Sequence, residues 1–165
     1  MLRLNRMTDY AILFLATLSA RQDEIVPAAV VANATQLNQP TIAKIAKALV
    51  KAGIITAERG VNGGYRLACA PSQINAAQII EAIEGPIALT ACVDGADTTC
   101  DTRHGCFMSG QWNEVNHSIR HALEQVTLDK LFNPETMFLP PHDVAGQTSN
   151  NHLDDHHVSS QTVSS

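Results

Sequence analysis

The chain has 165 residues, of which 45% are hydrophobic and 4% aromatic, and its formal net charge is −5. This length supports one ordinary core, which aliphatic side chains must build because aromatic residues are few. The longest apolar run near the N-terminus, Ala11 to Leu18, is too short to cross a bilayer, and no small-residue cleavage pattern follows a charged leader. We therefore expect a soluble cytoplasmic protein and no membrane partner.

Charge is distributed unevenly along the chain. Residues 1–69 hold eight Lys or Arg against four Asp or Glu, a net charge of +4. Residues 70–165 hold three against twelve, a net charge of −9. A basic front half can contact phosphate while an acidic rear half keeps the protein in solution. An uneven surface without functional meaning is the alternative.

The first two predicted helices lie in residues 1–35. Thr8 is expected to cap the first helix, and the second is expected from Ala28 to Ala34 with Pro27 in its first turn. The apolar residues of the first helix recur at the spacing of one buried face: Ala11, Phe14, Leu15 and Leu18.

A third helix is expected to begin at Asn38 or Gln39, with Pro40 in its first turn, and to end at Gly53 in the left-handed conformation. Its apolar face consists of Ile42, Ile45, Ala46 and Leu49. Off this face lie Thr41, Lys44, Lys47 and Lys51. These hydroxyl and ammonium groups can meet a polyanion, although a solvated lysine face is the alternative.

Two β-strands, Ile54 to Ala57 and Tyr65 to Ala68, are predicted on either side of a glycine-rich turn that contains Asn-Gly-Gly. Three helices followed by a hairpin is the order of a winged helix-turn-helix. In that fold the third helix enters the DNA major groove and the hairpin, or wing, approaches the adjacent backbone. We therefore predict a mainly α fold with a small β-hairpin wing, and a DNA-binding domain at residues 1–70.

The sequence after residue 70 predicts a helix that begins with a capping box of Asn75 and Gln78 and ends at Gly85-Pro86. A long helix is expected from about Ser109 to Val126, and a last short helix, capped by Thr127, through Phe132. Apolar residues of the long helix alternate spacings of three and four: Trp112, Val115, Ile119, Ala122 and Val126.

That pattern indicates a dimerisation helix that pairs with a second copy of the chain, with packing inside one chain as the alternative. We expect residues 71–133 to hold the dimerisation helices and a cysteine loop. Residues 134–165 form a polar tail that we expect to be disordered from about residue 140.

Three of the four cysteines, Cys92, Cys100 and Cys106, lie in a stretch rich in glycine and aspartate, separated by seven and five residues. Cytosolic thiols stay reduced, so metal ligation or redox sensing is the expected role. Three thiolates select an iron-sulfur cluster or zinc, and both require a fourth ligand. The spacing lacks a C-x2-C pair, which favours a cluster. Unrelated thiols are the alternative, and Cys69, which ends a wing strand, is not expected to be a ligand.

The opening Met1-Leu2-Arg3-Leu4 with Thr8-Asp9-Tyr10-Ala11, the wing from Glu58 to Leu67 and the three-cysteine loop resemble the IscR and NsrR family of bacterial regulators. The stretch from Glu84 to Cys92 is most similar to the branch that regulates the Suf system of iron-sulfur assembly. The resemblance covers residues 1 to about 133. It implies a homodimeric winged-helix transcription factor that binds a double-stranded DNA operator.

By the same resemblance, the cysteine loop holds a 2Fe-2S cluster, or a 4Fe-4S cluster, near the dimerisation helix, and the cluster's occupancy or redox state changes DNA affinity. Four residues should face the major groove and a fifth should enter the minor groove. The four are Asn38, Gln39, Thr41 and Lys44, and the fifth is Arg59.

The fourth cluster ligand departs from one branch of this family. The Isc-type pattern has a histidine three positions after the third cysteine, where this chain has Ser109. In the nitric-oxide-responsive branch an aspartate near the start of the first helix ligates the partner's cluster, and Asp9 matches that position. Asp9 is therefore the first candidate, followed by His104 and His117, although a carboxylate there also favours the helix dipole.

Together these features predict a regulator that represses iron-sulfur assembly genes while cluster is plentiful. A nitric-oxide or redox-responsive cluster repressor is the alternative within this class, and a zinc-stabilised interaction module is the alternative outside it. An enzyme is not expected, because the sequence has neither a C-x-x-C motif nor a nucleophile elbow.

Overall fold

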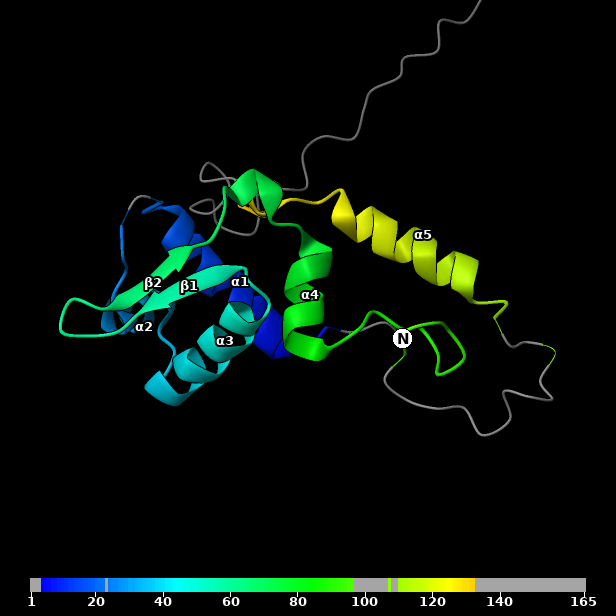
Figure 1. Ribbon diagram of the computed structural model, residues 1–165, viewed down its shortest axis with the longest axis horizontal. Helices are drawn as coiled ribbons and strands as arrows, with labels where there is room; N and C mark the ends of the chain where they lie inside the picture. Colours follow the sequence, from blue (N-terminus) through cyan, green and yellow to red (C-terminus); the bar gives the residue numbers. More distant parts are fainter. Residues whose placement is uncertain (1–3, 23, 97–106, 108–109, 133–165) are drawn as a thin grey trace, which may run out of the picture. The chain divides into compact units, whose positions relative to one another are not determined.

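The structure is a computed structural model that describes residues 4–22, 24–96, 107 and 110–132. Within these residues the chain is mainly helical with one antiparallel hairpin (Figure 1), which confirms the predicted fold class. The elements are α1 (Arg6–Ser19), α2 (Ala28–Thr35), α3 (Gln39–Lys51), β1 (Ile55–Glu58), β2 (Gly64–Leu67), the short 3₁₀ helix η1 (Pro71–Gln73), α4 (Ala76–Glu84), α5 (Asn113–Glu124) and α6 (Leu128–Leu131).

The start of α1 differs from the sequence prediction. Asn5, not Thr8, is the N-cap, and its side-chain oxygen accepts a hydrogen bond from the amide of Met7 at 3.1 Å. Thr8 lies one turn inside the helix, is fully buried, and donates its hydroxyl to Glu84. The prediction of Thr8 as the cap was therefore wrong, because the hydroxyl has a partner that is distant in the sequence.

The helix-turn-helix segment agrees with the prediction to within a residue. A turn through Gln36, which adopts a left-handed conformation at φ 57°, connects α2 to α3. Asn38 caps α3 by accepting a hydrogen bond from the amide of Thr41 at 2.9 Å. Gly53 follows α3 with φ +72°, which confirms the expected left-handed residue at the helix end.

The wing is a two-stranded hairpin in which Ile55 pairs with Leu67 and Glu58 pairs with Gly64. Each strand is offset by one residue from its predicted position. Gly64 lies against the backbone of Val26, where a Cβ atom would be 2.4 Å from the carbonyl oxygen. Two backbone hydrogen bonds between Val26 and Tyr65, of 2.8 and 2.9 Å, then attach the wing to the segment before α2.

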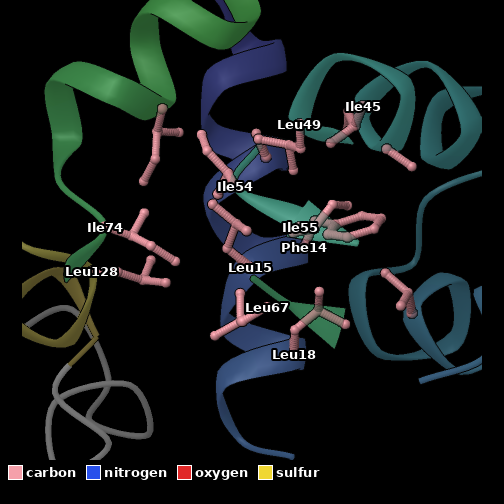
Figure 2. Packing of buried hydrophobic residues seen from close by; sticks show 14 of the residues in the cluster. Phe14, Leu15, Leu18, Ile45, Leu49, Ile54, Ile55, Leu67, Ile74 and Leu128 are labelled. Atoms are coloured by element: carbon pink, nitrogen blue, oxygen red, sulfur yellow. The ribbon is translucent and has the colours of Figure 1, made fainter. Parts of the chain in front are cut away.

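The hydrophobic core joins the front and rear halves of residues 4–132. Phe14 and Leu15 of α1 pack in one cluster with Leu49 of α3 and with residues of the wing. Figure 2 shows Ile74 and Leu128 beside each other and facing α1. The amide of Leu128 donates to the carbonyl of Ile74 at 2.7 Å, which returns the chain to the core after α5. One hydrophobic core therefore spans the predicted domain boundary at residue 70. The division into a DNA-binding domain and a rear domain stays a prediction about function.

The predicted capping box of α4 is confirmed, because Asn75 and Gln78 each accept a hydrogen bond from the other's amide at 3.0 Å. The helix ends at Gly85, as expected. At the rear, Thr127 occupies the predicted N-cap position of α6, but its hydroxyl bonds the Asp129 carboxylate and lowers the pKa of that group.

Helix α5 is shorter than the prediction of residues 109–126. Trp112 stands at its N-cap, preceded by Gly110 with φ +79°, and Val126 lies beyond its end. Trp112 and Val115 of the predicted seam are 40% and 43% exposed, and Asn116 is the one buried residue within α5.

The described helices include none long and apolar enough to span a membrane. The expected disordered tail lies outside the described residues.

Candidate functional site

Helix α3 presents one polar face outside the core. Its apolar residues Ile42 and Ile45 are buried, whereas Lys44, Lys47 and Lys51 are exposed on the other side of the helix. The predicted contact residues Gln39 and Lys44 are exposed, and Thr41 is half-buried. The helix therefore offers ammonium, amide and hydroxyl groups without disturbing its packing, as a helix in a DNA groove requires.

Asn38 combines two features of this surface. It is exposed, and its side-chain oxygen caps α3 by accepting from the Thr41 amide. The side-chain oxygen is thus held in place, and the amide nitrogen of the same group is the part available to donate to another molecule. The sequence predicted Asn38 for DNA contact, and the capping bond adds a reason for a fixed orientation.

The wing carries the other predicted DNA-contact residue. Arg59 is exposed directly after β1, and Val61 at the tip is fully exposed. Glu58 and Arg66 lie across the hairpin with 3.8 Å between their charged groups, both about half exposed. Cys69, which was not expected to be a metal ligand, is exposed two residues after the end of β2.

Cys92 is the one predicted cysteine ligand that lies in the described residues. It is half-buried, its amide donates to the Thr90 hydroxyl at 3.3 Å, and the next residue, Val93, is buried. Cys100, Cys106 and His104 lie outside the described residues. Asp9 is exposed in the first turn of α1, and His117 is exposed on α5. Among the described residues, no group of three metal-ligating side chains comes together.

A buried asparagine attaches residues 87–89 to α5. These residues lead into the stretch that carries the three cysteines, called here the cysteine segment. Asn116 accepts a hydrogen bond from the amide of Leu89 at 3.0 Å and donates to the carbonyl of Ile87 at 2.9 Å. One side chain therefore satisfies two backbone groups of a segment that has no regular structure. The path of the chain three residues before Cys92 is fixed by α5.

A second asparagine repeats this arrangement closer to Cys92. Asn113, at the first position of α5, accepts from the amide of Asp94 at 3.0 Å and donates to its carboxylate at 2.7 Å. The residues on both sides of Cys92 are thus bound to the same helix. These hydrogen bonds position the backbone on both sides of the first predicted ligand.

The end of α4 contacts the N-terminal turn of α1. The Glu84 carboxylate accepts from the Asn5 amide at 2.8 Å and from the Thr8 hydroxyl. Asp9, the predicted fourth ligand, follows Thr8 directly. The contact therefore joins the end of α4, which leads into the cysteine segment, to the helix that carries Asp9.

An ion pair joins α4 and α5. Arg120 donates to both carboxylate oxygens of Glu81, at 2.9 and 3.3 Å, and this carboxylate raises the pKa of Arg120. Beside it, a mostly apolar pocket of about 310 Å³ lies between Leu4, the two helices and residues 86–89. Sequence spacing gave no signal for Glu84, Asn113 or Asn116, because each partner lies at least 19 residues away.

The fold and the polar faces of α3 and the hairpin define a winged helix-turn-helix DNA-binding protein. A family model described as "Rrf2: Iron-dependent Transcriptional regulator" matches residues 4–134. The chain belongs to the Rrf2 family of transcriptional regulators.

Individual relatives agree with this assignment. The chain is 30% identical over 135 residues to the HTH-type transcriptional regulator NsrR of Halalkalibacterium halodurans, covering 81% of this chain and 92% of that one. CymR, the global cysteine regulator of B. subtilis, is similar in structure with a TM-score of 0.59, 22% identity and coverage of 79% and 96%. T. potens IscR has a TM-score of 0.55, 24% identity and coverage of 79% and 85%. As a member of this family of transcriptional regulators, the protein is not an enzyme.

Proposed function

We propose that the protein is a homodimeric DNA-binding regulator whose cysteine segment carries an iron-sulfur cluster and whose DNA affinity depends on that cluster. The observation that supports it most directly is the attachment of the residues around Cys92 to α5 by Asn113 and Asn116. Glu84, at the end of α4 just before this segment, connects α4 to the start of α1. A change at the cysteines is therefore well placed to affect α1 and α5 together.

The donor set fits an iron-sulfur cluster. Cys92, Cys100 and Cys106 supply three thiolates, the ligands that hold such clusters in proteins, and Asp9 supplies a carboxylate oxygen as the proposed fourth ligand. A bound cluster would supply redox-active iron. Oxidants or nitric oxide would change the charge of the cluster or remove sulfide from it. The family's description as iron-dependent supports a metal of this kind. A 2Fe-2S cluster is favoured, and a 4Fe-4S cluster has the same ligands.

For DNA recognition we propose that Asn38, Gln39, Thr41 and Lys44 enter the major groove and that Arg59 enters the minor groove. Asn38 caps α3, the next three lie on α3, and Arg59 is exposed at the wing. In a dimer the two copies of α3 must match two half-sites about 34–36 Å apart. A small change at α1 or α5 alters that spacing, so the affinity for an operator changes with it.

The proposed dimer forms through the exposed seam of α5, and the proposed target genes are those for iron-sulfur assembly, repressed while cluster is plentiful. Trp112 and Val115 of the seam are large, apolar and exposed in the single chain. Residues 1–70 are the proposed DNA-binding domain and residues 71–133 the proposed sensing and dimerisation domain.

The test is an analysis of iron and acid-labile sulfide, with the visible spectrum, of protein purified without oxygen. We expect a coloured protein with both elements, and Cys92→Ala, Cys100→Ala and Cys106→Ala should each lose them while staying dimeric. A triple variant that retains iron and sulfide would overturn the ligand assignment. Colourless protein that binds only zinc would make the segment a structural zinc site.

A nitric-oxide response is the second candidate function. Asp9 supports it, because an oxygen ligand is bound to iron less firmly than a thiolate and leaves the cluster more reactive. Operator binding measured before and after addition of nitric oxide separates the two candidates. Loss of binding after nitric oxide, with iron supply constant, would favour this second function.

A further inference from the structure

Two histidines lie one helical turn apart on the surface of α5. The rings of His117 and His121 are parallel to within 8°, and their centroids are 6.4 Å apart. Four residues of α-helix rise about 6 Å, so this spacing means that both side chains leave the helix in the same direction. Both residues are exposed, and the His121 side chain is 63% exposed. The pair is therefore open to a small ligand.

A carboxylate one turn further on is placed to orient the second ring. The Nδ1 atom of His121 lies 3.6 Å from the Glu124 carboxylate, and Arg120 holds the other oxygen of that carboxylate at 3.4 Å. A carboxylate beside Nδ1 favours the tautomer with its hydrogen on that atom, which leaves Nε2 with a lone pair. Histidine metal ligands commonly have such a carboxylate partner on the opposite nitrogen.

We propose that His117 and His121 form a two-histidine binding site for a divalent first-row transition metal ion such as Zn²⁺, separate from the cysteine segment. Imidazole nitrogens suit zinc, copper and nickel, and histidines at i and i+4 are the spacing with which one helix face holds zinc. This site goes beyond the proposed cluster function and does not depend on it. It also gives His117 a role other than fourth ligand of the cluster.

The coordination of this site is only partly supplied by one chain. No third histidine, cysteine or carboxylate completes a cluster of ligands among the described residues. Water therefore fills the other positions, so the ion exchanges readily. Zinc–nitrogen bonds are about 2.0–2.1 Å long, so the two exposed rings must turn toward each other on binding.

The test follows each histidine separately, because the cysteines and the histidines of residues 134–165 also bind zinc. Full-length protein labelled with ¹⁵N is titrated with Zn²⁺, and the imidazole nitrogens are recorded in long-range ¹H–¹⁵N correlation spectra. We expect the signals of His117 and His121 to shift together at one Zn²⁺ concentration, with Nε2 as the bound atom of His121.

A matched control keeps the number of histidines and the net charge. In H121Q/Q125H the second ring moves a further turn along α5, to a position that is exposed in this structure. Two rings eight residues apart cannot share an ion, so the joint shift should be lost. Glu124→Gln should keep the joint shift but weaken the affinity about tenfold, as loss of an outer partner does at other metal sites.

Three outcomes would overturn the proposal. The first is that neither signal shifts in the wild-type protein. The second is that His117 shifts alone while His121 stays unchanged, which would instead associate His117 with the cysteines. The third is that H121Q/Q125H responds to Zn²⁺ as the wild-type protein does.

Discussion

At the scale of single residues, side chains that bond to backbone groups position the segment around Cys92. Asn113 and Asn116 each make two hydrogen bonds to this segment, and Glu84 makes two to the start of α1. Removal of Asn116 is costly, because its backbone partners at Ile87 and Leu89 are half-buried.

Asn116→Ala should lower the free energy of unfolding by about 1–3 kcal/mol, since the Leu89 amide and the Ile87 carbonyl both lose their partner. Urea denaturation followed by circular dichroism measures this change. Ser118→Ala, at an exposed position of the same helix, is the control and should stay within about 0.5 kcal/mol of wild type. Equal stability of the two variants would show that the Asn116 bonds are not needed.

Two basic residues test the DNA surface in different ways. Arg59→Ala should weaken operator binding, because the wing would lose the proposed minor-groove contact. Lys44→Ala should reduce the slope of log K against log salt by about 1 if its ammonium group contacts a phosphate. Fluorescence anisotropy at several salt concentrations measures both, with Lys130→Ala on α6 as the control. Unchanged binding by both variants would disprove this placement of the interface.

At the scale of helices and strands, local signals in the sequence were sufficient where an element depends on its neighbours in the chain. The capping box of α4 involves partners three residues apart and was predicted, and the predicted start of α3 at Asn38 or Gln39 agrees with the observed bond from the Thr41 amide to Asn38. Thr8 was misassigned because Glu84, its actual partner, is 76 residues away. The two hydrogen bonds from Asn116 to the backbone of Ile87 and Leu89 were missed for the same reason.

Contact between α1 and α4 can be measured with a double-mutant cycle. Thr8→Val removes the hydroxyl that donates to Glu84, and Glu84→Ala removes the accepting carboxylate. We expect a coupling energy of about 0.5–3 kcal/mol between the two changes in urea denaturation, as for other residues in direct contact. Thr17, whose hydroxyl bonds within α1, provides the control pair Thr17→Val with Glu84→Ala. Full additivity for the Thr8 pair would show that the contact contributes nothing.

At the scale of the whole molecule, one core in residues 4–132 holds the winged helix together with α4 and α6. Ile74 and Leu128 from the rear half pack in the same cluster as Phe14 and Leu49. Trp112 and Val115 of the predicted seam are exposed in the single chain, whereas Ile119 and Val126 are half-buried, so pairing through α5 stays a prediction from apolar spacing. The ligand set of the cysteine segment could be predicted only as residue types, because the sequence carries no distances.

The dimer can be tested on α5 itself. Val115→Glu should convert the protein to monomers and reduce operator affinity, because a charge would be buried in the seam and only one half-site could then be held. Sedimentation equilibrium and anisotropy measure the two effects. Ser118→Glu adds the same charge at an exposed position outside the predicted seam and should remain dimeric. A dimeric Val115→Glu protein would locate the interface elsewhere.

The most direct test of a cluster-dependent regulator is operator affinity measured for the same protein with and without its cluster. The DNA is the genomic fragment that the protein itself selects, and iron and sulfide are determined in each sample. We expect the dissociation constants of the two states to differ by at least about fivefold, the lower end of typical coupling between sites. Equal affinities, with the cluster present in one sample and absent from the other, would contradict the proposed function.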